Sequence, residues 1–142
     1  MRALLDINIL IALHDRDHVH HRRASDWLAD NIQHGWASCP LTQNGCLRIM
    51  SQPAYPNAQS LQVLVPMLRS ATAHPHHRFW HDDISVLDEG CFHHPHIHGA
   101  RQLTDLYLLA LAVRNEGRLI SFDQRIPLSA VPGAARRHLV AL

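Results

Sequence analysis

Residues 103–123 read Leu-Thr-Asp-Leu-Tyr-Leu-Leu-Ala-Leu-Ala-Val-Arg-Asn-Glu-Gly-Arg-Leu-Ile-Ser-Phe-Asp, and this stretch decides the fold. Thr104 is a suitable N-cap for a helix over residues 105–116, and the glycine that follows suits its C-terminal end. This helix is apolar on nearly every side, which predicts a central position. A short apolar strand follows at once and ends at Asp123. A central helix turning directly into a buried strand is typical of an α/β fold.

Short apolar runs and segments of helical periodicity alternate through the rest of the chain. Further strands are predicted at residues 3–5, 36–38, 84–87 and 139–142, the last as an edge strand. Further helices are predicted at residues 7–13, 20–33 and 40–50, and after Asn57 as a cap for a segment that carries Leu61, Leu64, Val65 and Leu68. The alternation predicts one α/β domain over residues 1–142, a sandwich with a short, mainly parallel sheet.

Composition narrows the class of protein. Hydrophobic residues make up 46% of the 142 residues and charged residues 18%, which excludes an intrinsically disordered chain. The longest strongly apolar run, residues 106–113, is far shorter than the ~20 residues of a membrane span. No secretory signal is expected, and three cysteines are typical of a protein from the reducing cytoplasm. All 13 basic residues are arginines and the net charge is +1, so any nucleic-acid contact has to be local.

Three carboxylates stand where chemistry is expected. Asp6 and Asp123 each end a predicted strand, and Asp105 opens the central helix. In open α/β sheets, binding sites form beyond the carboxyl ends of the strands. Clustered carboxylates repel one another, and a hard cation such as Mg²⁺ or Mn²⁺ relieves that repulsion. Taken singly, each acid also fits a helix-cap, first-turn or turn role, so the residues alone leave both interpretations open.

Three segments together resemble the motifs of PIN-domain ribonucleases. Leu4-Leu5-Asp6-Ile7-Asn8 is similar to the opening motif of that family, and residues 103–112 are similar to its acidic central helix. Residues 119–123, Leu-Ile-Ser-Phe-Asp, resemble its late strand with a terminal acid. The order, the intervals and the length resemble the VapC toxins of bacterial toxin–antitoxin pairs. The resemblance implies a PIN-like three-layer α/β/α sandwich.

The resemblance also implies roles for individual residues. Asp6, Asp105 and Asp123 match the metal-binding, catalytic carboxylates. Asn8 matches the small polar residue that orients the first acid. Thr104 matches the hydroxyl residue that precedes the helix acid.

One position departs from the family pattern. The third helix usually carries an acid near the site, whereas Asn44 stands at that place here. An amide can offer a carbonyl oxygen or hold a water, but it brings no charge. We therefore include Asn44 among the catalytic candidates and expect three formal negative charges instead of four. Arg48 and Arg125 are candidates for RNA phosphate contact, with surface ion pairs as the alternative.

The function that the resemblance implies is a Mg²⁺- or Mn²⁺-dependent endoribonuclease, the toxin of a VapBC-type pair. Metal-activated water is expected to hydrolyse RNA phosphodiesters. The implied partners are the RNA substrate, a VapB-type antitoxin and a second copy of the chain in a homodimer. No membrane contact is expected.

Two other functions stay open. The missing fourth acid is compatible with a non-catalytic PIN module that binds RNA or protein. The 14 histidines, and above all the tract His93–His98, are compatible with a protein that binds a transition metal. No Cys or His spacing resembles a closed zinc site, so we expect a solvated loop there.

Overall fold

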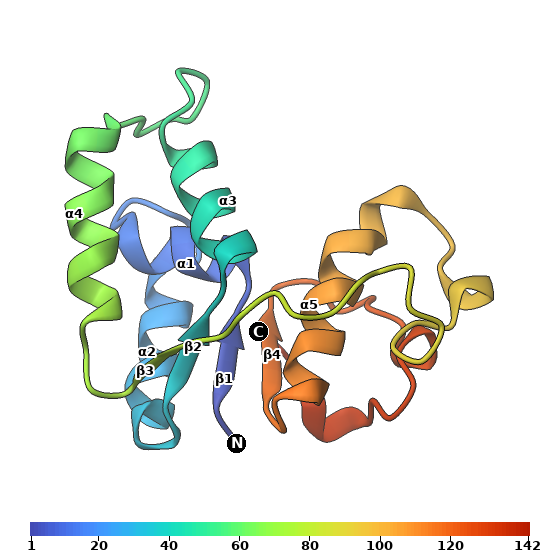
Figure 1. The fold of residues 1–142 in the computed structure, drawn as a ribbon. Coiled ribbons are helices and arrows are strands. Elements are labelled where there is room, and N and C mark those ends of the chain that lie inside the picture. The colour runs from blue at the N-terminus through green and yellow to red at the C-terminus, as the bar shows by residue number, and fades with distance from the viewer.

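The computed structural model describes residues 1–142, and a sheet of five short strands lies at its centre (Figure 1). The strands are β1 (Ala3–Leu5), β2 (Trp36–Ser38), β3 (His77–Phe79), β4 (Arg118–Ser121) and β5 (Leu139–Ala141). Their order is β3-β2-β1-β4-β5, and all four pairings are parallel. Strand β1 is central, with Leu5 opposite Ile120 of β4. The predicted parallel sheet is confirmed, and β5 lies at its edge as expected.

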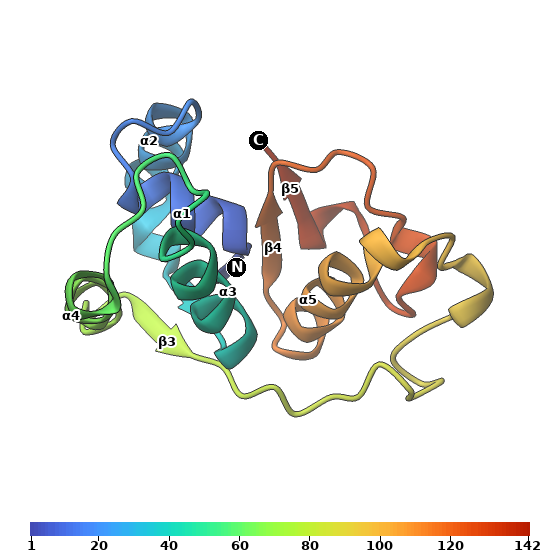
Figure 2. The same cartoon turned by 90° about the horizontal axis from the view of Figure 1, so that it is seen from above.

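Helices cover both faces of the sheet. They are α1 (Ile7–His14), α2 (His21–Asn31), α3 (Pro40–Met50), α4 (Leu61–Thr72) and α5 (Leu103–Arg114). Seen from above, α1 to α4 lie on one side of the strands, whereas α5 and the turns near the C-terminus lie on the other (Figure 2). The three-layer α/β/α sandwich is therefore confirmed.

The strands are apolar on both faces because each face packs against a helical layer. Leu4 and Leu119 belong to the core cluster around α5, whereas Leu5 and Ile120 belong to the cluster around α1 and α3. All four side chains are fully buried. Alternate residues of a strand point to opposite faces, so a strand covered on both sides has to be apolar throughout.

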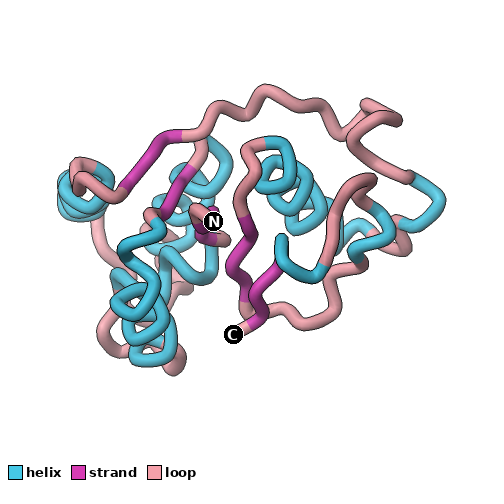
Figure 3. The backbone as a smooth tube through the Cα atoms, turned by 90° about the horizontal axis from the view of Figure 1, so that it is seen from below, coloured by secondary structure: helices cyan, strands magenta, loops and turns pink.

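The strand predicted at residues 84–87 is wrong. These residues lie in coil and a turn, within the long connection that runs from β3 past the α5 layer (Figure 3). Ile84 and Val86 are apolar because they pack against the α5 core cluster. The missed strand is β3, whose residues are half-buried or exposed and carry no apolar alternation. Its pairing with β2 defines it, and that pairing is tertiary information.

Two predicted helix starts are also wrong. Thr104 is not the N-cap of α5, because the chain is already helical from a 3₁₀ turn at Ala100–Gln102 and enters α5 at Leu103. Asn57 does not cap α4, which begins after Ser60. The two helices themselves are confirmed.

Candidate functional site

Asp6 is a buried carboxylate between the two central strands and helix α1. It follows β1 directly, caps α1 and is only 5% exposed. Its Oδ1 accepts a hydrogen bond from the backbone N–H of Ile7 at 2.6 Å, and its Oδ2 accepts one from Ser121 Oγ at 2.9 Å. The Asp6 N–H donates to the Ile120 carbonyl at 3.1 Å, which continues the β1–β4 pairing. The side chain is thus fixed from two directions.

Ser121 connects Asp6 to Asp123. Its hydroxyl donates to Asp6 and accepts the Asp123 backbone N–H at 3.1 Å. Ser121 is buried at the end of β4, and the sequence interpretation missed it. The available signal was a small polar residue at the end of an apolar strand, two positions before an acid.

Asp105 completes the group from the opposite layer. It lies in the first turn of α5, where the helix dipole favours an acid, and it is half-buried. Burial, together with repulsion from Asp6 and Asp123, raises the pKa of Asp105 to about 6. Burial also raises the pKa of Asp6, against the effect of its two hydrogen bonds and with a contribution from Asp123. Asp6, Asp105 and Asp123 therefore lie close enough to repel one another.

This electrostatic environment fits a divalent cation. Asp6 is buried with Asp123 acting on it, and the half-buried Asp105 is repelled by both of these acids. Bound Mg²⁺ or Mn²⁺ relieves repulsion of this kind through carboxylate oxygens. The side chains do not converge on one point: no three acid, histidine or cysteine side chains form a group that could hold a metal ion. The chain thus supplies the charge and the oxygen donors, and the remaining ligands of an ion would be waters or phosphate oxygens.

Three predicted supporting residues lie at the surface. Asn44, Asn8 and Thr104 are all exposed, and none of their side chains makes a hydrogen bond within the chain. Asn8 therefore does not orient Asp6 in this structure, because Ser121 and the Ile7 backbone do so. Asn44 lies in α3 with its amide free for solvent or substrate.

Helix α3 approaches the site through a glycine. A Cβ atom at Gly45 would lie 2.5 Å from Cδ1 of Ile7, the first residue of α1. Only a residue without a side chain allows this close packing of α3 on the start of α1. Gly45 thereby lets α3 pack against Ile7, the residue that follows Asp6.

The two predicted RNA-contact arginines differ in their surroundings. Arg48 is exposed in the last turn of α3 and forms no ion pair within the chain. Arg125 has its Nε 3.7 Å from Asp123 Oδ1, and its backbone N–H donates to the same oxygen at 2.8 Å. The Arg125 side chain is 92% exposed, so this ion pair is weak and solvent-screened.

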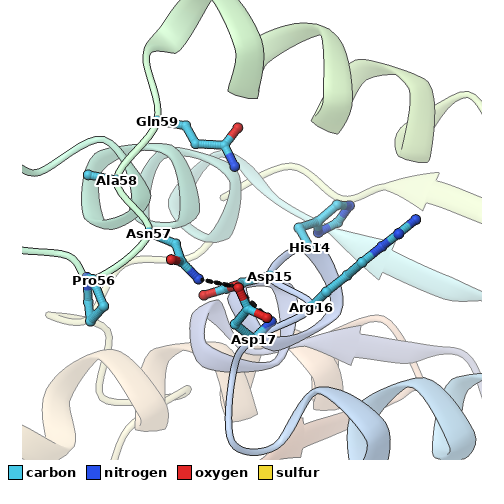
Figure 4. A pocket seen from close by; sticks show the side chains of 8 residues that line it. All are labelled: His14, Asp15, Arg16, Asp17, Pro56, Asn57, Ala58 and Gln59. Carbon is cyan, nitrogen blue, oxygen red and sulfur yellow. Dashed lines mark hydrogen bonds between the residues drawn. The ribbon is translucent and has the colours of Figure 1, made fainter.

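A hollow of about 600 Å³ lies elsewhere, between the α1–α2 and α3–α4 loops (Figure 4). Its two acids, Asp15 and Asp17, already accept hydrogen bonds from side chains of the other loop. Asp15 accepts hydrogen bonds from the Tyr55 hydroxyl and from Asn57 Nδ2 at 3.0 Å, and Asn57 also donates to Asp17 at 3.1 Å. These bonds join two loops, which explains the cluster as a structural connection.

The histidine tract is held by backbone contacts. His94 Nε2 lies 2.7 Å from the Val86 carbonyl, and His96 Nδ1 lies 3.3 Å from the Ser129 carbonyl. The rings of His93 and His96 stack edge to face with centroids 4.2 Å apart. None of these rings belongs to a group of three potential metal ligands.

No helix in the fold combines the length and the apolar character that crossing a membrane requires.

Comparison with known proteins agrees with this arrangement. The sequence model of the PIN domain matches residues 3–133. Ribonuclease VapC44 of Mycobacterium tuberculosis is 50% identical over 142 residues, which is 100% of both chains. Ribonuclease VapC38 of the same species is 42% identical over 85% of this chain and 84% of its own.

A solved structure shares the fold. The crystal structure of VapBC2 from Rickettsia felis bound to a promoter DNA fragment contains a chain that matches with a TM-score of 0.62. The match covers 99% of this chain and 98% of that chain, at 13% identity. The order of motifs, the α/β/α layers and the full-length identity lead to one conclusion: this chain belongs to the PIN-domain family, among the VapC ribonucleases.

Proposed function

We propose that this chain is a divalent-metal-dependent endoribonuclease, the toxin of a toxin–antitoxin pair, and that Asp6, Asp105 and Asp123 form its active site. One observation carries the proposal. Asp105 has a pKa raised to about 6 by burial and by the charges of the other two acids. Burying like charges together costs stability, so a chain that does so has another use for them. Strongly raised pKa values accordingly cluster at functional sites.

The residues of the chain divide the work. Asp6 and Asp123 offer carboxylate oxygens from the ends of adjacent strands, and the Ser121 hydroxyl bonds both the Asp6 carboxylate and the Asp123 backbone N–H. Asp105 offers a third carboxylate from the α5 layer. A divalent ion held by these acids would supply Lewis acidity and a water of lowered pKa for attack on a phosphodiester. Asn44 can position a water or a substrate oxygen from α3, since its amide is unpaired.

Cleavage of RNA by the purified protein tests the proposal. With Mg²⁺ or Mn²⁺ we expect discrete fragments that carry a 5′-phosphate and a 3′-hydroxyl, and no fragments in EDTA. Asp105→Asn should lower the cleavage rate at least 100-fold, because the third charge of the site is lost while the side-chain shape is kept. Asp30→Asn is the matched control, since Asp30 is exposed in α2 and its carboxylate makes no hydrogen bond.

Two outcomes would contradict the proposal. Cleavage that persists in EDTA, or that leaves a 2′,3′-cyclic phosphate, would exclude hydrolysis by metal-activated water. Binding of RNA without cleavage at any metal concentration would favour the non-catalytic PIN module. In that case the Asn44→Glu variant, which adds a fourth acid, is tested for RNA cleavage. Cleavage by this variant would show that Asn44 accounts for the missing activity, and no cleavage would support a non-catalytic protein.

The partner of this ribonuclease is proposed from its relatives. The Rickettsia felis structure is a VapBC complex, so we propose a VapB-type antitoxin for this chain as well. A basic antitoxin side chain would pair favourably with the three acids, and arginine does so with two parallel hydrogen bonds. The homodimer and the cytoplasmic location stay predictions.

A further inference from the structure

A second hollow, of about 400 Å³, opens beside the carboxylate site. The loop of residues 98–102 lines one side of it, and Asp123 and Arg125 line the other. The two walls come from the segment before α5 and the segment after β4, so both adjoin an acid of the proposed active site. Whatever occupies this hollow lies next to Asp123.

The hollow carries two arginines that no stable internal ion pair engages. Arg101 is exposed, and no carboxylate lies within 4.0 Å of its guanidinium. Arg125 meets only Asp123, at 3.7 Å and with a side chain that is 92% exposed. A screened pair of this kind exchanges easily for a better anion. The hollow therefore has an excess of positive charge beside a group of acids.

The loop that carries Arg101 leaves open space beside Gly99. Gly99 has open space where a side chain would begin, with nothing within 4 Å of an ideal Cβ. The His98 N–H donates to Gln102 Oε1 at 3.0 Å, which closes the loop on itself. Residues 100–102 form a 3₁₀ turn that continues into α5, so Arg101 is joined to Asp105 through one continuous helical segment.

We propose that this hollow binds a backbone phosphate of the RNA next to the scissile one, with Arg101 and Arg125 as its ligands. The inference rests on the proposed ribonuclease function. Guanidinium groups match phosphate oxygens with paired hydrogen bonds, and they read no base. The hollow thus positions the strand beside the carboxylates, and Arg125 exchanges its contact with Asp123 for the phosphate. Arg101 and Arg125 are positioning residues, separate from the acids.

Binding in the absence of cleavage tests this inference. A fluorescein-labelled single-stranded RNA of mixed sequence is titrated with the Asp105→Asn protein in EDTA at pH 8, and fluorescence anisotropy reports Kd. We expect Arg101→Gln and Arg125→Gln each to raise Kd about fivefold, and the double variant about 25-fold. Arg69→Gln, on α4 in the opposite layer, is the control and should change Kd less than twofold.

A kinetic measurement separates positioning from structural damage. In the otherwise wild-type protein with Mn²⁺, Arg101→Gln should raise KM and leave kcat within about threefold, while Arg101→Lys should recover part of the affinity. The wild-type chain in EDTA provides a second binding background if Asp105→Asn folds poorly.

The results distinguish this inference from the proposed function. If Kd is unchanged in both single variants, the phosphate site is refuted, and the hollow is then free for an acidic segment of a protein partner. If Kd rises as expected but the wild type never cleaves RNA, the phosphate site stands and the nuclease proposal fails.

Discussion

Asp105 shows at the level of a single residue how the site stores unfavourable energy. Its first-turn position suits a negative charge, yet burial and two neighbouring acids raise its pKa to about 6. In the unfolded chain an aspartate titrates near ~3.9. At neutral pH the folded, metal-free protein therefore holds a charge that the unfolded chain accommodates more easily.

Asp105→Asn should consequently stabilise the metal-free protein. Because the folded pKa is raised, the folded state binds more protons than the unfolded state between about pH 4 and pH 6, and stability falls as pH rises through that window. At pH 8 in EDTA we expect the variant to gain about 1–2 kcal/mol, a few degrees in Tm. The gain should vanish as the pH approaches 4, and thermal melts across this range measure it.

Added metal gives the complementary result. Mg²⁺ or Mn²⁺ should raise the Tm of the wild type more than that of Asp105→Asn, since an ion stabilises the folded state in proportion to its binding. Loss of stability in the metal-free variant at pH 8 would show that Asp105 is not strained by its neighbours.

At the level of elements, Asp15 joins two loops that are far apart in sequence. It ends α1, and it accepts hydrogen bonds from Tyr55 and Asn57 of the connection between α3 and α4. Figure 4 shows the bond from Asn57. In the same loop as Asp15, the ring of His20 has its centroid 4.7 Å from that of Phe122, the residue before Asp123. This loop therefore contacts the segment that leads to Asp123, an acid of the proposed active site.

Tyr55→Phe should weaken this connection. The Tyr55 hydroxyl is the main cause that lowers the pKa of Asp15, so its bond favours the charged carboxylate. A carboxyl whose pKa is lowered in the folded state adds stability at pH values above its unfolded pKa of ~4. That stability disappears as the pH falls through the folded pKa. We expect a loss of about 1 kcal/mol at pH 7, measured by urea unfolding, that shrinks toward pH 3.

Gln59→Ala is the control for that experiment. Gln59 lines the same hollow, but its side chain makes no hydrogen bond. A loss equal to that of Tyr55→Phe, or a loss independent of pH, would mean that packing and not the hydrogen bond to Asp15 fastens the loops.

At the level of the whole molecule, the balance of charge limits how RNA can be held. Thirteen arginines and 12 acids leave a net charge of +1, so no broad positive field draws nucleic acid to the surface. Binding then depends on a few contacts at the carboxyl end of the sheet, among them Arg101 and Arg125.

A shallow salt dependence of RNA binding should follow. Each phosphate contact with a single strand contributes a slope of about −0.7 to the logarithm of the association constant against that of salt. Two or three contacts predict a slope between about −1.4 and −2.1 at pH 8 for the Asp105→Asn protein. A slope steeper than about −4 would show an extended binding surface that the positions of these arginines do not explain.

Sequence patterns by themselves determined most of the layers. Apolar runs short enough for strands alternate with segments of helical period, and both signals are local because each reports which face of an element is buried. Asp6 marked the end of β1, and β4 ends at Ser121, two residues before Asp123. The parallel order of the sheet puts the carboxyl ends of both strands at one edge. The family resemblance predicted Asp105 as the third acid.

Tertiary structure alone decided the features that depend on partners distant in sequence. The strand β3 exists through its pairing with β2, while the apolar residues 84–87 are buried by packing without forming a strand. Ser121 bonds Asp6 across 115 positions of the chain. The phosphate hollow likewise joins two segments that share no local pattern. The periodicity of a segment shows which of its faces is buried. It does not show which other segment packs against that face or bonds to it, because those partners come together only when the sheet assembles.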